Sequence, residues 1–223
     1  MIPLRDNIPS RTRPWVNYLL VFLNVGVFLY EIALLNAGLL EKFILRWGFA
    51  PSSFLGNPLA KIPTLFSAMF LHGGVTHLGG NMLYLWIFGD NVEDWYGHWR
   101  YLIFYLLCGL AASFGQMTTN IHSTMPTIGA SGAIAGVLGS YFLLYPNARV
   151  LTLIPFGFFM RVVEIPAFFF LGFWFIMQMM SGTLSLGSQT GGVAWWAHIG
   201  GFLAGVGLLL IFRWRRRATD YTD

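Results

Sequence analysis

The chain has 223 residues, of which 56% are hydrophobic and only 10% are charged. A soluble domain carries about 25% charged residues, so this composition excludes a water-soluble globular protein and predicts a polytopic membrane protein. The net charge of +4 comes largely from arginines near the two ends, which suits anionic lipid headgroups and argues against nucleic acid as a partner. Cys108 is the only cysteine, which excludes an internal disulfide and a cysteine-rich metal site.

The first apolar segment follows a polar N-terminal stretch, begins at Trp15 and ends near Leu35. It is longer than the apolar core of a signal peptide and no small-residue cleavage pattern follows it, so we expect a retained transmembrane span. Residues 37–64 mix short apolar patches with Pro, Gly and charged residues. None of these patches could cross a bilayer, so we expect a long first outer loop, at about 37–76, that lies partly in the membrane interface.

Two long stretches lack charged residues, one between Arg100 and Arg149 and one between Glu164 and Arg213. Each is too long for one span of roughly 20 residues and suits two spans with a turn between them. We therefore expect five further spans, at about 77–92, 101–118, 130–146, 164–182 and 195–213. The predicted fold class is an all-α membrane protein with a single six-helix domain, in which residues 1–14 are an N-terminal segment, 15–213 the core and 214–223 a tail.

The distribution of lysine and arginine predicts the orientation of these spans. If both ends lie in the cytoplasm, the outer loops hold Lys42, Arg46 and Lys61, and the inner segments hold the other ten cations: Arg5, Arg11, Arg13, Arg100, Arg149, Arg161, Arg213, Arg215, Arg216 and Arg217. This bias obeys the positive-inside rule. The second, fourth and sixth spans would then enter the membrane from its outer face.

Four polar residues within these spans share one depth, close to the outer face. His77 and Asn81 lie in the first turns of the second span. Ser131 lies in the first turn of the fourth span and His198 in the first turn of the sixth. Polar groups are expensive inside a membrane and often mark function, so their gathering at one depth predicts a site.

Small residues could bring the fourth and sixth spans into close contact. Gly132 begins a small-residue face on the fourth span, and Gly201 and Gly205 form a small-xxx-small pair on the side of the sixth span that carries His198. Such faces let helix backbones approach closely. A short hydrogen bond between Ser131 and His198 would require this approach.

The chemistry that these residue types suit is nucleophilic catalysis. A serine hydroxyl is a weak nucleophile until a base such as neutral histidine takes its proton. The resulting oxyanion needs donors, which the Asn81 amide, a His77 N–H and the Ser131 backbone N–H could supply. Glu31 is the one acid at the depth of His198, so we expect a Ser–His dyad, with Glu31 as the candidate for a third member.

Each of these residues also has a purely structural interpretation. Ser131 could be one more small residue of a packing face, and Asn81 could form an interhelical hydrogen bond. Position 133 is Ala, so the sequence is not the G-x-S-x-G turn of soluble hydrolases. The combination at one depth favours a catalytic site over each separate interpretation.

Three motifs, in this order on six spans, resemble those of the rhomboid intramembrane serine proteases. They are His72-x4-His77-x3-Asn81, Gly129-Ala130-Ser131-Gly132 and Ala197-His198-x2-Gly201-x3-Gly205. The resemblance covers nearly the whole chain. It implies that Ser131 is the nucleophile and His198 the general base. It also implies that Asn81 and His77 form part of the oxyanion site and that His72 supports that site. The residues with an implied structural role are Gly129, Gly132, Gly201, Gly205 and Glu93.

One departure from the family pattern lies in the first outer loop. This chain has Pro63 and Thr64 where many relatives carry Trp-Arg or a similar pair. The departure concerns how the loop docks in the membrane and does not touch the dyad.

The resemblance implies an intramembrane serine endopeptidase that needs no metal or cofactor. A substrate's transmembrane helix would enter between the second and fifth spans and be cut near the outer face. The expected partners are transmembrane protein substrates and membrane lipids, and the expected location is a prokaryotic plasma membrane, with both termini in the cytoplasm.

Two alternatives stay open. A non-proteolytic rhomboid-like protein would bind membrane helices without cutting them, although such proteins typically lack the serine or the histidine. A membrane transporter could use the histidines as ligands. However, the chain has no HExxH motif and no intramembrane acid beyond Glu31 to drive an ion path.

Overall fold

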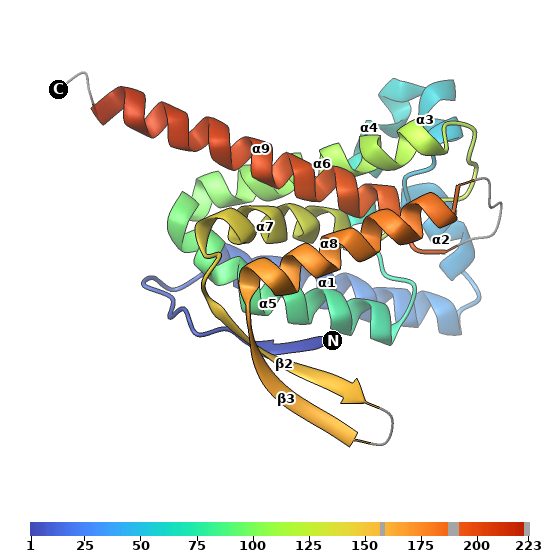
Figure 1. Ribbon diagram of the computed structural model, residues 1–223. Coiled ribbons are helices and arrows are strands. Elements are labelled where there is room, and N and C mark those ends of the chain that lie inside the picture. Colours follow the sequence, from blue (N-terminus) through green and yellow to red (C-terminus); the bar gives the residue numbers. More distant parts are fainter. Residues whose placement is uncertain (157–158, 187–191, 221–223) are drawn as a thin grey trace.

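The computed structural model describes residues 1–156, 159–186 and 192–220, and most of these are helical (Figure 1). Each expected span contains a long helix, but the expected fifth span, 164–182, begins in a strand and its helix starts only at Ala167. The six long helices are α1 (Trp15–Asn36), α5 (Val75–Tyr96), α6 (His98–Thr119), α7 (Ser131–Leu144), α8 (Ala167–Leu184) and α9 (Trp195–Asp220). Helix α9 continues beyond the expected end of its span, so most of the expected tail is helical.

Four of these helices are long and apolar enough to cross a membrane, namely α1, α6, α8 and the Trp195–Arg213 part of α9. Helix α7 is apolar but has only 14 residues. Helix α5 has 22 residues and carries Asp90, Glu93 and Asp94 in its last two turns. The chain is therefore an integral membrane protein by composition. Of its six long helices, α7 is the shortest.

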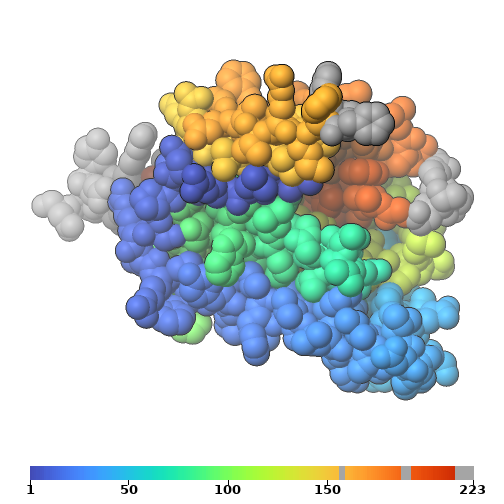
Figure 2. All heavy atoms as spheres, turned by 90° about the horizontal axis from the view of Figure 1, so that it is seen from below, coloured from blue at the N-terminus to red at the C-terminus, as the bar shows by residue number. Residues whose placement is uncertain are grey.

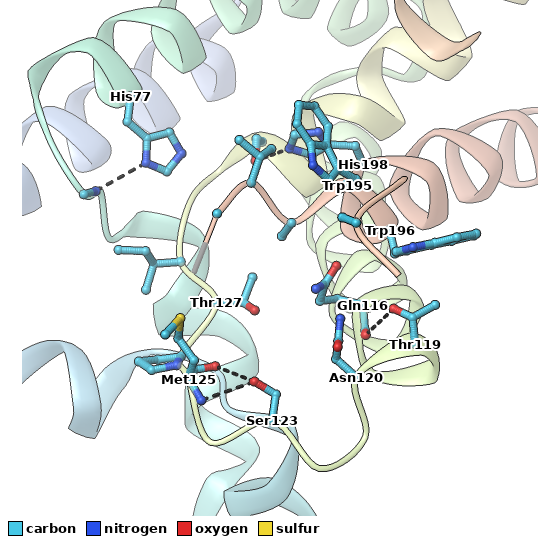
Figure 3. A pocket seen from close by; sticks show the side chains of 18 of the residues that line it. His77, Gln116, Thr119, Asn120, Ser123, Met125, Thr127, Trp195, Trp196 and His198 are labelled. Atoms are coloured by element: carbon cyan, nitrogen blue, oxygen red, sulfur yellow. Dashed lines mark hydrogen bonds between the residues drawn. The ribbon is translucent and has the colours of Figure 1, made fainter. Parts of the chain in front are cut away.

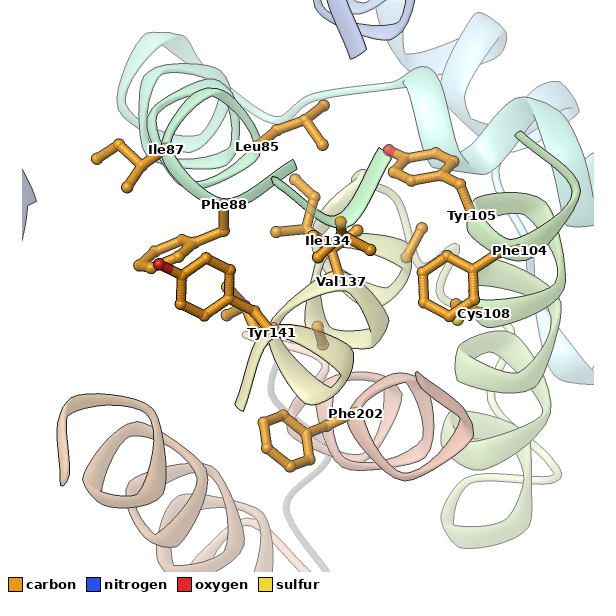
Figure 4. Packing of buried hydrophobic residues seen from close by; sticks show 14 of the residues in the cluster. Leu85, Ile87, Phe88, Phe104, Tyr105, Cys108, Ile134, Val137, Tyr141 and Phe202 are labelled. Carbon is orange, nitrogen blue, oxygen red and sulfur yellow. The ribbon is translucent and has the colours of Figure 1, made fainter. Parts of the chain in front are cut away.

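Helix α7 occupies the middle of the bundle and is contacted by α5, α6, α8 and α9 (Figure 1). All ten residues from Gly132 to Tyr141 are buried, which is the expected surroundings of a helix that is apolar all round. On one side the ring of Phe88 from α5 meets Tyr141 edge to face, with 4.9 Å between centroids (Figure 4). On another side Phe202 of α9 packs into the same cluster.

Glycines set the distance between α7 and α9. A Cβ at position 201 would overlap the carbonyl oxygen of Gly132, and one at position 205 would overlap that of Gly136. Gly132 is itself confined on its other side, because its Cβ would meet that of Ala112 at 2.5 Å. The two backbones are thus in direct contact along the side of α9 that carries His198.

The segment expected to be a long outer loop is largely helical. It holds α2 (Leu40–Trp47), α3 (Pro51–Gly56), α4 (Pro58–Ser67) and the 3₁₀ helix η1 (Ala68–Phe70). Pro51 and Pro58 each begin a helix, where a proline loses no hydrogen bond. Pro63 lies inside α4, and the Thr64 hydroxyl donates to the Lys61 carbonyl at 2.7 Å. The Pro63–Thr64 pair that departs from the family pattern therefore lies within one short helix.

The prediction of an all-α protein needs a correction, because the chain also forms a three-stranded antiparallel sheet. Its strands are β1 (Ile2–Arg5), β2 (Arg149–Phe156) and β3 (Phe159–Pro166), in the order β1-β2-β3. Strands β2 and β3 pair in register from Arg149↔Pro166 onward, and Ile2 pairs with Leu153. The strands are rich in Val, Ile and Leu, so their apolar sequence looks like the approach to a span.

The N-terminal residues tie this sheet to the helices. Figure 2 shows them between the hairpin and α5. The hydroxyl of Tyr141 donates to Asp6, and the amide of Asn91 donates to the Ile8 carbonyl at 3.0 Å. Asp94 accepts from the backbone N–H groups of Arg11 and Thr12.

Glu93 holds the start of α1 against the end of α5. Its carboxylate accepts from the backbone N–H groups of Val16 and Asn17, at 3.0 and 2.7 Å. These are orphan donors of a helix N-terminus, which a negative charge stabilises. His98 adds a contact of 2.5 Å to the same carboxylate, so Glu93 connects three helices.

Candidate active site

Ser131 and His198 lie in direct contact although 67 positions separate them in sequence. The Oγ atom of Ser131 is 2.8 Å from Nε2 of His198. Ser131 is the first residue of α7, and His198 lies in the first turn of α9. The glycine-mediated contact between these two helices brings their N-terminal ends together, and with them the two side chains.

The other ring nitrogen of His198 meets a residue that the sequence analysis did not single out. Nδ1 lies 2.8 Å from Oε1 of Gln178, a buried side chain of α8. The available signal was one amide in an otherwise apolar span, a feature that often indicates function. No motif accompanies it, and the phenylalanines of the same helix favour packing and lipid contact as its role.

Glu31, the candidate for a third member, lies elsewhere. Its carboxylate accepts from the backbone N–H of His72, with distances of 3.1 and 3.3 Å to its two oxygens. It is therefore a support of the loop before α5. The group that contacts Nδ1 of His198 is a neutral amide and not this acid.

His72 lies behind Asn81 and orients it. Nδ1 of His72 is 3.3 Å from the Phe70 carbonyl, which can only accept, so this nitrogen carries the proton. Nε2 is then an acceptor, and Nδ2 of Asn81 donates to it at 2.9 Å. Burial lowers the pKa of His72 to about 4, which keeps the ring neutral. One N–H of the Asn81 amide is thereby fixed, and the other is left for the cavity.

His77 is oriented by the same logic. Its Nδ1 accepts from the backbone N–H of Gly73 at 3.3 Å, so the proton of the neutral ring is on Nε2. A Cβ at position 129 would lie 2.8 Å from this Nε2 and 3.6 Å from Oγ of Ser131. Gly129 also has a φ of +125°, a conformation that favours glycine. Glycine here leaves open the space between the His77 ring and the hydroxyl.

These side chains meet at a cavity of about 1350 Å³. Figure 3 shows His77 and His198 approaching it from two different helices. Ser131 and Asn81 also line it, together with the 119–128 segment and the indole rings of Trp174, Trp195 and Trp196. His72 and Gln178 are not among the lining residues, so each contacts the site from behind.

Comparison with known proteins identifies the group of proteins to which this arrangement belongs. Residues 60–215, which include every site residue from His72 to His198, match the family model of the rhomboid domain. The chain belongs to the rhomboid family. This rhomboid is 31% identical to Rhomboid protease GluP of Bacillus subtilis, over 81% of the present chain and 34% of the relative.

Mitochondrial proteins are also among the relatives of this rhomboid. It is 27% identical to Rhomboid protein 1, mitochondrial, of Saccharomyces cerevisiae, over 85% of the present chain and 51% of the relative. It is 32% identical to the human Presenilin-associated rhomboid-like protein, mitochondrial, over 44% and 27% of the two chains. The chain therefore spans between about a quarter and a half of the length of these three relatives.

The histidines of this rhomboid are not arranged as a metal site. Within the described residues, no group of three or more His, Cys, Asp or Glu side chains could hold a metal ion. The rings of His72 and His77 are 5.0 Å apart between centroids. Both nitrogens of His72 and Nδ1 of His77 contact protein atoms. The chemistry that this geometry allows is proton transfer between a hydroxyl and an imidazole.

Proposed function

We propose that this rhomboid is an intramembrane serine endopeptidase that cleaves transmembrane segments of membrane proteins. The observation that carries the proposal is the 2.8 Å contact between Oγ of Ser131 and Nε2 of His198 at the wall of a large cavity. A serine needs a base within hydrogen-bond reach to act as a nucleophile. Membership of the rhomboid family and a relative named as a protease also support the proposal of a protease.

In the proposed reaction, Ser131 is the nucleophile and His198 the general base. Nε2 of His198 takes the hydroxyl proton as Oγ bonds to the carbonyl carbon of the scissile peptide. The same proton then passes from His198 to the leaving amine as the C–N bond breaks. A water molecule then bonds to the acyl carbon while Nε2 takes one of its protons, and this proton passes to Oγ as the ester C–O bond breaks, which releases the new carboxyl group and restores the Ser131 hydroxyl.

The oxyanion of the tetrahedral intermediate has three candidate donors. One N–H of Asn81 is fixed by His72, which aims the remaining N–H toward the cavity. His77 carries its proton on Nε2, next to the space that Gly129 leaves open. The backbone N–H of Ser131 belongs to the first turn of α7, where N–H groups have no intrahelical partner and the helix dipole favours negative charge.

We infer that six helices, α1 and α5 to α9, span the membrane with both termini in the cytoplasm, and that cleavage occurs near the outer face. The excess of arginine in the inner segments supports this orientation. A substrate helix would enter between α5 and α8, as the resemblance implies. The proposed partners are transmembrane proteins and lipids, and the proposed location is a prokaryotic plasma membrane.

The test is a cleavage assay on a panel of single-span membrane proteins, with Ser131→Ala and His198→Ala beside the wild type. Both variants should lose cleavage to a similar extent, because nucleophile and base act as a unit. Ser113→Ala is the matched control, since its hydroxyl donates to the Gly109 carbonyl of its own helix, α6. Cleavage by Ser131→Ala at the wild-type rate would refute the nucleophile, and a wild type that binds helices without cutting them would favour the non-proteolytic alternative.

A further inference from the structure

We propose that Gln178 is a positioning residue that fixes the tautomer and the orientation of His198, in the place where a serine-protease triad has a carboxylate. The inference rests on the proposed function and extends its machinery to a third helix. Gln178 is buried, contacts Nδ1 of His198 at 2.8 Å and does not line the cavity. It would therefore act through His198 and not through the substrate.

The direction of the Gln178 amide follows from its second hydrogen bond. Its Nε2 donates to the backbone carbonyl of Trp174 at 3.2 Å. A carbonyl can only accept, so the NH₂ group of the amide must lie on this side. The atom that contacts His198 is then Oε1, because the amide has only one other polar atom.

The amide direction decides which nitrogen of His198 is the base. Oε1 can only accept, so Nδ1 of the neutral ring carries the proton and Nε2 presents its lone pair to Oγ of Ser131. A reversed amide would donate to Nδ1 and leave the proton on Nε2, where it could not receive one from the hydroxyl. A fixed backbone carbonyl on α8 thus selects the tautomer that a general base requires.

The same helix also supplies packing for the imidazole. The Trp174 ring lies 5.9 Å from that of His198 at an interplanar angle of 33°, and the Trp195 ring meets it edge-on at 6.2 Å. Trp174 and Gln178 are one helical turn apart on α8. An amide suits this place because a neutral group is less expensive to bury in an apolar bundle than a carboxylate. The base therefore depends on α8 as well as on α7 and α9.

The experiment compares Gln178→Leu, Gln178→Met and Gln178→Glu with the wild type in detergent, measuring kcat, KM and thermal unfolding. Leu and Met remove both hydrogen bonds and should lower kcat by about 10-fold to 100-fold, the effect of a misplaced catalytic group. KM should stay unchanged because Gln178 does not face the cavity. Glu, kept protonated by the apolar surroundings, donates its hydroxyl to the Trp174 carbonyl and keeps an acceptor oxygen toward Nδ1, so it should restore most of kcat.

Met179→Leu is the matched control, since Met179 is the exposed next residue of the same helix. The inference is overturned if folded Gln178→Leu or Gln178→Met keeps more than half of the wild-type kcat, or if the loss appears in KM. It is also overturned if Gln178→Glu unfolds normally yet is as slow as Gln178→Leu. If Gln178→Leu fails to fold, Gln178→Met and Gln178→Glu decide. Absence of cleavage by the wild type would instead refute the proposed function.

Discussion

At the scale of single residues, three histidines are each fixed by a partner that can only donate or only accept. A backbone N–H sets the tautomer of His77, a backbone carbonyl sets that of His72, and the Gln178 amide oxygen sets that of His198. The consequence is directional. His77 presents a donor toward the cavity, whereas His198 presents an acceptor to Ser131.

Glu31 contacts the His72 backbone and not His198, so its charge should not be needed for cleavage. Glu31→Gln should keep most of the cleavage rate, because Gln retains an oxygen that can accept from the His72 N–H. Glu31→Ala should leave this buried donor unpaired, at a cost of roughly 1–3 kcal/mol in stability. Turnover and thermal unfolding of both variants test this. A loss of roughly 10⁴-fold in folded Glu31→Gln, the size seen when a triad acid is neutralised, would contradict the separation of Glu31 from His198.

At the scale of elements, the contact between α7 and α9 depends on glycines in a way that two variants of one helix can test. Gly201→Ala should destabilise the protein by about 1–3 kcal/mol, because its Cβ would overlap the Gly132 carbonyl and force the backbones apart. Gly207→Ala is the matched control. A Cβ there meets no atom within 4 Å, and Ala favours a helix over Gly by up to about 1 kcal/mol.

Thermal unfolding in detergent distinguishes the two glycines. Gly201→Ala should also lose activity at temperatures where it stays folded, because separation of α7 from α9 lengthens the contact between Ser131 and His198. Equal unfolding temperatures for Gly201→Ala and Gly207→Ala would show that the close approach does not set the stability of this helix pair.

Asp6, the residue after β1, adds a pH-dependent contact with Tyr141 at the end of α7 far from Ser131. Burial raises the pKa of Asp6 from 3.8 to about 6, and the hydrogen bond from Tyr141 opposes the rise. The folded chain therefore binds this proton more tightly than the unfolded chain. The resulting stabilisation is fully present below about pH 4 and is lost as the pH rises through about 6. Asp90 is the charged neighbour that raises the pKa further.

Asp6→Asn should accordingly flatten the fall of the unfolding temperature between about pH 4 and pH 6. Glu41→Gln, which removes an exposed carboxylate of α2, is the matched control and should keep the wild-type slope. An unchanged slope in Asp6→Asn would mean that another group is responsible for the pH dependence in this range.

At the scale of the whole molecule, the sequence predicts the approximate positions of the six long helices, because long apolar runs bounded by charged residues are its strongest signal. Helix α5 runs past its expected end at residue 92 for a physical reason. Glu93 and Asp94 bond to backbone N–H groups of the N-terminal segment and of α1, partners that lie about 80 positions away. Composition alone treats these acids as the end of a span.

The parts that the sequence did not predict depend on long-range pairing. Strand β1 pairs with β2 across about 150 positions, and no local pattern announces such a partner. Shared depth could be predicted for Ser131 and His198, and Gly201 and Gly205 indicated a close approach of their two spans, but the register that places Oγ 2.8 Å from Nε2 could not be predicted. Gln178 is a single amide without a motif, and only its geometry distinguishes it from an interhelical hydrogen bond.

The number of membrane spans can be decided by a labelling experiment. If α5 and α7 both cross the membrane, the start of α6 lies inside and the segment after α6 lies outside. If only the four most apolar helices cross, both positions are reversed. Trp99, at the start of α6, is 78% exposed, and Ile121, just beyond the end of α6, is 45% exposed. Cysteines at these two positions should therefore be labelled from opposite sides of the membrane in the two topologies.

We predict six spans, because α7 is buried among α6, α8 and α9, which are long and apolar enough to cross, and because the arginine bias favours an inner loop at Arg100. In intact cells, a membrane-impermeant maleimide should label Ile121→Cys and should label Trp99→Cys only after permeabilisation. Leu59→Cys, in the exposed part of α4, should be labelled from outside in either topology. Native Cys108 is buried and gives a low background. Labelling of Trp99→Cys but not Ile121→Cys in intact cells would establish four spans and would place Ser131 at a different depth from the one proposed.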